Sequence, residues 1–84
     1  YPNPFNPSTT ISYNLPKTGS VRLDIYNIKG QLVRTLVNDH KTAGSHSVIW
    51  DGKDDNGRAA STGVYFYRMV TPDKVLTNKM LMMK

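Results

Sequence analysis

The stretch that decides the fold is SVRLDIY, residues 20–26. Its apolar residues Val21, Leu23 and Ile25 alternate with the charged residues Arg22 and Asp24. A period of two places successive side chains on opposite faces of an extended chain. The stretch therefore predicts a β-strand with one face in the core and the other in solvent.

The same alternation recurs on both sides of this stretch. It appears at residues 9–15, 46–50 and 63–71, and no window of eleven residues shows the spacing of an amphipathic helix. Trp50, the only tryptophan, stands at the end of its segment and is interpreted as a core side chain. The predicted core consists of Tyr13, Val21, Leu23, Ile25, Val48, Trp50, Tyr65 and Tyr67.

Three further segments complete the strand set. Residues 31–37 contain the adjacent apolar pairs Leu32-Val33 and Leu36-Val37, which predict a bulge or a strand covered on both faces. Residues 58–60 predict a short edge strand, residues 75–83 a final strand, and residues 38–45 a polar loop. About seven short strands separated by turn residues predict an all-β, immunoglobulin-like antiparallel β-sandwich.

The length of 84 residues fits a single domain over residues 1–84, with an extended, proline-rich lead-in at residues 1–8. The sequence has no cysteine, so packing rather than disulfides must stabilise it. Because it begins at Tyr1 without methionine, we interpret it as a piece of a longer protein. No transmembrane segment is expected, because no apolar stretch is long enough to cross a bilayer.

The net charge of +5 raises the question of an anionic partner. The 11 basic residues, however, are spread almost evenly along the chain. Even spacing is typical of solvated strand faces and edges, so nucleic-acid binding is not expected.

The sequence offers no pattern for catalysis. There is no nucleophile elbow, and His40 and His46 lie six residues apart across a loop, which is not a spacing for shared metal ligation. We therefore expect neither an enzyme, a catalytic residue nor a cofactor.

The loop at residues 51–57, DGKDDNG, carries the only concentration of acidic residues. Turn formation is the preferred interpretation, because Asp, Asn and Gly favour tight turns. Calcium binding through Asp51, Asp54 and Asp55 is a weaker alternative, since the loop lacks the spacing and the distal glutamate of a known calcium loop. No other metal site is expected.

Three segments carry a resemblance to a known family. They are YPNPFNPSTTI at residues 1–11, VIWDGKDDNG at residues 48–57 and TGVYFYR at residues 62–68. In this order they resemble the type A C-terminal sorting domain of type IX secretion cargo. The signature residues would be Pro2, Asn3, Pro4, Gly63, Tyr65, Lys79 and Lys84.

This resemblance implies a non-catalytic module that directs an upstream, covalently linked cargo across the outer membrane. Its partners would be the outer-membrane translocon and a sortase-like peptidase. The protein would be secreted or anchored at the surface of a Gram-negative bacterium, after passage through the periplasm.

The chain is also similar to the immunoglobulin-like domain of the flagellar hook-capping protein. Both share the Trp50-Asp51-Gly52 stretch and the GVYFY stretch at residues 63–67. This similarity implies the alternative role of a structural or spacer module with hook-cap-like assembly. Carbohydrate binding through the aromatic side chains is a third, weaker alternative.

The final strand allows two physical interpretations. With Lys79 and Lys84 near its ends, it could offer backbone groups and two cations to a receptor. Alternatively, both lysines only protect a sheet edge from aggregation. The sequence leaves both interpretations open.

Overall fold

The computed structural model describes residues 8–83, which form six strands in two antiparallel sheets and contain no helix. The strands are β1 (Thr9–Leu15), β2 (Gly19–Asn27), β3 (Leu32–Lys41), β4 (Gly44–Trp50), β5 (Gly63–Val70) and β6 (Val75–Met82). The predicted all-β, immunoglobulin-like sandwich is therefore confirmed. The seventh strand expected at residues 58–60 is reduced to a single bridge between Lys53 and Ala59.

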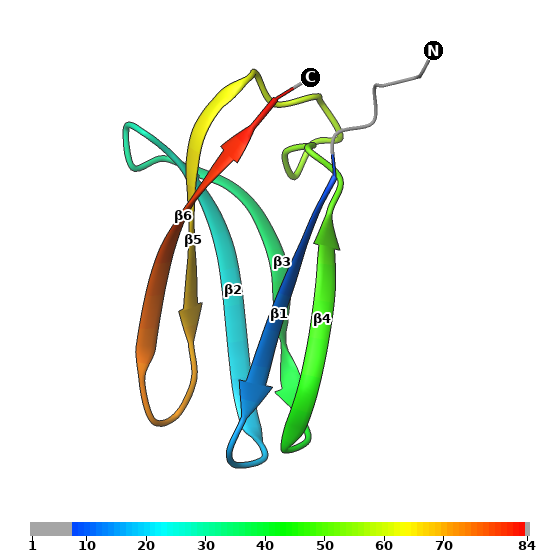
Figure 1. Cartoon of the computed structure of the whole chain (residues 1–84), viewed down its shortest axis with the longest axis vertical. Coiled ribbons are helices and arrows are strands. Elements are labelled where there is room, and N and C mark those ends of the chain that lie inside the picture. Colours follow the sequence, from blue (N-terminus) through cyan, green and yellow to red (C-terminus); the bar gives the residue numbers. More distant parts are fainter. Residues whose placement is uncertain (1–7, 84) are drawn as a thin grey trace.

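The two sheets differ in size. Strands β1 and β4 form the small sheet, and the large sheet has the order β3-β2-β5-β6. Figure 1 shows β6 and β4 on opposite sides of the molecule, with β1 and β4 lying over the β2 and β3 half of the large sheet. None of residues 8–83 forms a helix long and apolar enough to cross a membrane.

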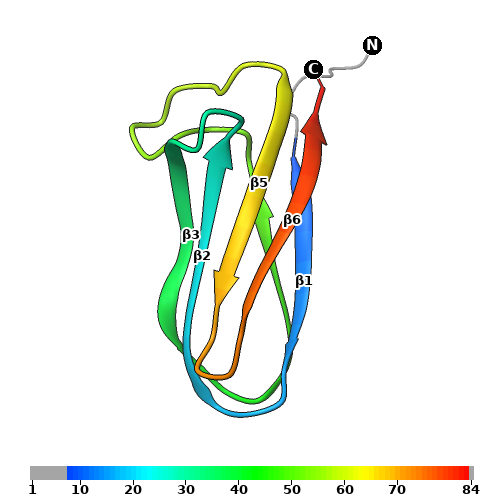
Figure 2. The same cartoon turned by 90° about the vertical axis from the view of Figure 1, so that its left-hand side faces the viewer.

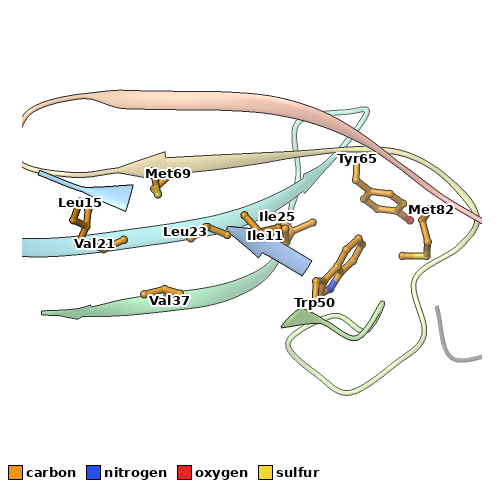
Figure 3. Close-up of a cluster of buried hydrophobic side chains, with 10 residues drawn as sticks. All are labelled: Ile11, Leu15, Val21, Leu23, Ile25, Val37, Trp50, Tyr65, Met69 and Met82. Carbon is orange, nitrogen blue, oxygen red and sulfur yellow. The ribbon is translucent and has the colours of Figure 1, made fainter. Parts of the chain in front are cut away.

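The inward-facing residues of β2 lie at the centre of the core. Val21, Leu23 and Ile25 are buried, as is Trp50 with 1% of its surface exposed. Figure 3 shows Trp50, Tyr65 and Met82 together at one end of this core. Three other predicted core residues, Tyr13, Val48 and Tyr67, are partly buried and pack against the buried cluster. The cluster also contains buried residues that were not in the predicted set: Ile11, Leu15, Val37, Met69 and Met82.

Strand β3 departs from the sequence expectation in two ways. The pairing with β2 skips Leu36 and Val33, so each adjacent apolar pair contributes one extra residue and the predicted bulge is confirmed. The strand also continues to Lys41, through residues expected to form a loop. This polar stretch is extended because it pairs with β2 up to Gly19, and hydrogen-bonded pairing does not require apolar side chains.

The hairpin between β2 and β3 turns at residues 27–30, as predicted. The Asn27 side chain accepts hydrogen bonds from the backbone N–H groups of Lys29 and Gln31. Gly30 adopts a φ of 83°, which glycine tolerates without a steric penalty. The expected lead-in, apart from Ser8, lies outside the described residues, and the assignment of residues 1–84 to one domain stays a prediction.

Candidate functional site

The loop between β4 and β5 is fixed to the core at both ends. Trp50 Nε1 donates a hydrogen bond to the backbone oxygen of Lys53 at 2.9 Å. The Tyr65 hydroxyl donates to the backbone oxygen of Ser61 at 2.6 Å. The two rings meet edge to face with centroids 5.2 Å apart. The conspicuous aromatic residues of the sequence thus position this loop from inside the sandwich.

The acidic residues of this loop, residues 51–57, which we call the Asp loop, bind the loop's own backbone. Asp51 Oδ1 accepts the N–H of Lys53, and Asp54 Oδ1 accepts the N–H groups of Asn56 and Arg58. Asp51 also pairs with Arg34 Nη1 at 2.8 Å. These contacts are typical of turn formation. Within residues 8–83 no three His, Asp or Glu side chains gather closely enough to hold a metal, so the calcium alternative at Asp51, Asp54 and Asp55 gains no support here.

The Asp loop also covers one edge of the large sheet. The Asp55 backbone N–H donates to Val33 O at 3.0 Å, and its Oδ1 accepts the N–H of Thr35 at 3.1 Å. Val33 and Thr35 belong to the edge strand β3, whose outer backbone groups would otherwise face solvent. Figure 2 shows the segment from β4 to β5 arching over this end of the sheet. The loop therefore extends hydrogen bonding beyond β3 without adding a full strand.

A buried carboxylate lies on the outer face of the large sheet. Asp24 alternates outward as predicted, yet only 5% of its surface is exposed. Its carboxylate accepts hydrogen bonds from Arg22 Nε at 2.9 Å, Tyr26 Oη at 3.3 Å and Thr35 Oγ1 at 2.8 Å. Three donors compensate for the loss of hydration of the charge. The sequence pattern predicted the direction of this side chain but missed the cover that its neighbours provide.

The opposite edge of the large sheet is strand β6. Its Lys79 is exposed and pairs across the sheet with Phe66. Large apolar side chains are exposed beside it: Val75 at 54%, Leu76 at 39% and Leu81 at 62%. This edge thus combines one cation with apolar surface and is the most exposed strand of the described chain.

The three predicted sorting-signature residues within residues 8–83 do not share one face of the sheet. Gly63 begins β5 opposite Met82, Tyr65 is buried in the core, and Lys79 lies on the outer face of β6. The remaining four, Pro2, Asn3, Pro4 and Lys84, lie outside the described residues. Tyr65 is buried and its hydroxyl fixes the loop before β5, so its ring offers no surface for recognition, whereas Gly63 is partly exposed.

The aromatic side chains within residues 8–83 are divided between the core and the outer faces and do not share one platform for a sugar. Trp50 and Tyr65 point into the core, whereas Tyr26 and Phe66 are cross-strand partners on the outer face. Tyr13 stacks on His46 with ring centroids 5.4 Å apart, and burial raises the pKa of its hydroxyl. An open cleft of about 570 Å³ lies between the β2–β3 turn and the Asp loop, but its single aromatic residue is Tyr65.

Comparison with known proteins identifies close structural relatives. The sequence model of the FlgD Ig-like domain family matches residues 6–74. The crystal structure of FlgD from P. aeruginosa is 32% identical, with a TM-score of 0.69 over 89% of this chain and 59% of that chain. FlgD from Xanthomonas campestris, described in connection with the hook capping essential for flagellar assembly, is 26% identical. Its TM-score is 0.70 over 92% of this chain and 56% of that one. The present chain thus spans less than two thirds of either relative, and no curated protein matches it.

These matches overturn the role in type IX secretion expected from sequence. The family model and the solved structures both match FlgD, and none of them matches a sorting domain. The prediction of a sorting domain is therefore wrong, and so is the prediction of the translocon and a sortase-like peptidase as its partners. The physical reason lies in the shared motifs. Trp50 and Tyr65 pack at the end of the core, and such residues indicate a sandwich without indicating its partner.

Proposed function

The chain belongs to the FlgD Ig-like domain family, and from this premise we propose that it is a non-catalytic assembly module of a hook-capping type of protein. The observation that carries the proposal is the match over residues 6–74, together with the relation to the hook-capping FlgD of Xanthomonas campestris. Because the chain spans only part of those relatives, hook capping by the whole parent protein is also part of the proposal.

The use of the polar side chains supports a role in assembly. Asp24 joins β2 to β3, Asp55 extends the edge of β3, and the Tyr65 hydroxyl fixes the loop before β5. These groups stabilise the sandwich, whose β6 edge and outer face remain as contact surfaces. The proposal includes the location expected from sequence, which is secreted or at the cell surface of a Gram-negative bacterium.

An exchange of domains tests the function. The Ig-like domain of Xanthomonas campestris FlgD is replaced by residues 1–84 in a strain that lacks the native gene, and hooks are counted by electron microscopy. We expect hooks to form, because the exchanged module has the same fold and a TM-score of 0.70 to the original structure.

The control is a protein from which the domain is deleted, which must fail to form hooks. A second control, Trp50→Ala in the exchanged domain, should form fewer hooks, because the module loses a large share of its folding stability. If the chimera is folded and exported but hooks are as rare as in the deletion strain, the proposed function is wrong.

A further inference from the structure

Strand β6 has the features of an unused pairing edge. Its register with β5 runs without a bulge from Gly63 opposite Met82 to Val70 opposite Val75. It contains no proline, and Lys79 is its only charged residue. Figure 1 shows β6 as the outermost strand of the large sheet, and no other strand of the described chain pairs with its outer side. A regular, apolar edge of this length is a template for another strand.

The hairpin before β6 fixes which backbone groups face outward. Thr71 N donates to Lys74 O at 2.9 Å, so Lys74 directs its backbone groups toward β5. Hydrogen-bonding direction alternates along an antiparallel strand. The N–H and C=O groups of residues 75, 77, 79 and 81 therefore point away from the sheet, while residues 76, 78 and 80 pair with β5.

The side-chain pattern of β6 is complementary to itself. In an antiparallel pair with Asn78 opposite Asn78 of a second copy, Val75 lies opposite Leu81, and Leu76 lies opposite Met80. These are the exposed or half-buried apolar residues of the strand, and each pairs with another apolar residue on the same face. The same register places residues 75, 77, 79 and 81 in the hydrogen-bonded pairs, as their outward backbone groups require.

The neighbouring register is less favourable. A shift that places Lys79 opposite Lys79 of the second copy brings two cations together and leaves Met80 opposite Asn78. Like charges in directly opposite positions destabilise a strand pair. From the free edge, the backbone direction and this pattern, we propose that β6 pairs antiparallel with β6 of a second copy, centred on Asn78, to form a continuous eight-stranded sheet.

The contact is small and the copies repel each other. One strand pair buries less than the roughly 1,200 Å² at which stable complexes begin, and each chain carries a charge of +5. The dimer is therefore weak and is strengthened by salt, which screens the charge. This inference concerns the isolated 84-residue chain and does not depend on the flagellar role, so either one can fail without the other.

Single cysteines test the register directly, because the natural chain has none. Asn78→Cys would meet its own copy in a non-hydrogen-bonded pair with Cα atoms about 4.5 Å apart, which a disulfide spans. Under mild oxidation at high protein concentration, we expect most Asn78→Cys chains to run as a dimer on non-reducing gels. The dimer should disappear on reduction.

Three matched variants control for random oxidation. In the proposed register, position 77 of one copy lies opposite position 79 of the second copy. Thr77→Cys alone and Lys79→Cys alone should therefore cross-link weakly, and a mixture of the two variants should cross-link strongly. Ser12→Cys, exposed on β1, should stay monomeric. Cross-linking of Asn78→Cys no stronger than that of Ser12→Cys, or strongest cross-linking by Lys79→Cys alone, overturns the proposal.

Sedimentation of the natural chain gives an independent test. The weight-average mass should rise toward twice the monomer mass as protein and salt concentrations increase. Thr77→Pro removes an outward N–H that β5 does not use, so this variant should remain folded by circular dichroism yet stay monomeric. A natural chain that is monomeric at millimolar concentration in high salt overturns the proposal.

Discussion

The two edges of the large sheet are handled in opposite ways. At β3, two bulges interrupt the register, and Asp55 satisfies the outer backbone groups of Val33 and Thr35. At β6, the register is unbroken and apolar side chains are exposed on both faces. One edge is closed by a loop of the same chain, and the other is left regular and open.

The difference shows that edge protection in this sandwich depends on a loop rather than on strand composition. The covering loop is held by Trp50 at its start and by the Asp51–Arg34 ion pair beside it. Nothing comparable holds a segment against β6 within residues 8–83. Damage to the closed edge should therefore cost folding stability, whereas changes at the open edge should alter association and leave the fold intact.

The largest effect is expected where the closed edge meets the core. Trp50→Ala removes a fully buried ring and the hydrogen bond to Lys53 O, and should cost about 3–5 kcal/mol of unfolding free energy. Since domains of this kind have about 5–15 kcal/mol in total, the variant should lose a large share of its stability and unfold at a clearly lower urea concentration. Urea titration followed by far-UV circular dichroism measures this, because the only tryptophan is lost.

Trp50→Phe is the matched variant. It loses the N–H that holds Lys53 but keeps an apolar ring in the core. Because the ring is kept, Trp50→Phe should lose clearly less stability than Trp50→Ala. Equal stability of Trp50→Ala and the natural chain would show that the ring does not anchor the sandwich.

The next effect concerns the carboxylate that joins β2 to the closed edge. Asp24→Ala removes the acceptor shared by Arg22, Tyr26 and Thr35, and should cost about 1.5–3 kcal/mol, the range for hydrogen bonds to a charged group. Asp24→Asn keeps the shape and one acceptor oxygen and should cost less. Chemical unfolding of both variants checks the order, and a stability of Asp24→Ala equal to that of the natural chain contradicts the prediction.

A smaller effect is expected at the outer side of β3. Asp55→Ala removes the acceptor of the Thr35 N–H, and should cost about 1 kcal/mol. Amide exchange at Thr35 should become faster, since its partner is lost. Asp55→Asn retains an oxygen acceptor, so the Thr35 amide should stay protected from exchange. Asp73→Ala, in the turn before β6, is the control for the loss of a negative charge. Unchanged Thr35 protection in Asp55→Ala would show that the loop does not close this edge.

Sequence reasoning was most reliable where pattern and local chemistry agree. Residues 9–15 alternate strictly, and β1 has these bounds. The pairs Leu32-Val33 and Leu36-Val37 predicted the bulges that the register of β3 contains. The polar residues 38–41 were expected in a loop, because their strand conformation depends on a partner distant in sequence rather than on their own hydropathy.

The functional interpretation failed for a related reason. The motif around Trp50 and the stretch from Gly63 to Tyr65 indicate the sandwich, which both resembling families share. The proline-rich start and the lysines of the final strand favoured the sorting family, and the comparisons support the hook-capping alternative instead. Trp50 and Tyr65 are buried inside the domain. The hydrogen bond from Thr35 to Asp24 depends on the tertiary arrangement, whereas an open edge at the final strand was one of the two interpretations that the sequence left open.

The smallest effect should occur at the open edge and should leave the fold unchanged. In the proposed dimer, Thr77 lies opposite Lys79 of the second copy, so Thr77→Glu creates two opposite-charge pairs, worth about 0.2–1 kcal/mol each. Dimerisation should therefore strengthen by about 2-fold to 30-fold for the two pairs together. Thr77→Lys should weaken it, because the new lysine faces Lys79.

Both substitutions also change the net charge of the chain, by one unit in opposite directions. Ser12→Glu and Ser12→Lys make the same changes on β1 and control for this general effect. Sedimentation equilibrium at low salt should separate Thr77→Glu from Ser12→Glu, and high salt should remove the difference, because ionic screening acts on the new pairs. If Thr77→Glu and Ser12→Glu change association equally, the change in net charge alone explains the effect, and the two copies do not meet at the open edge.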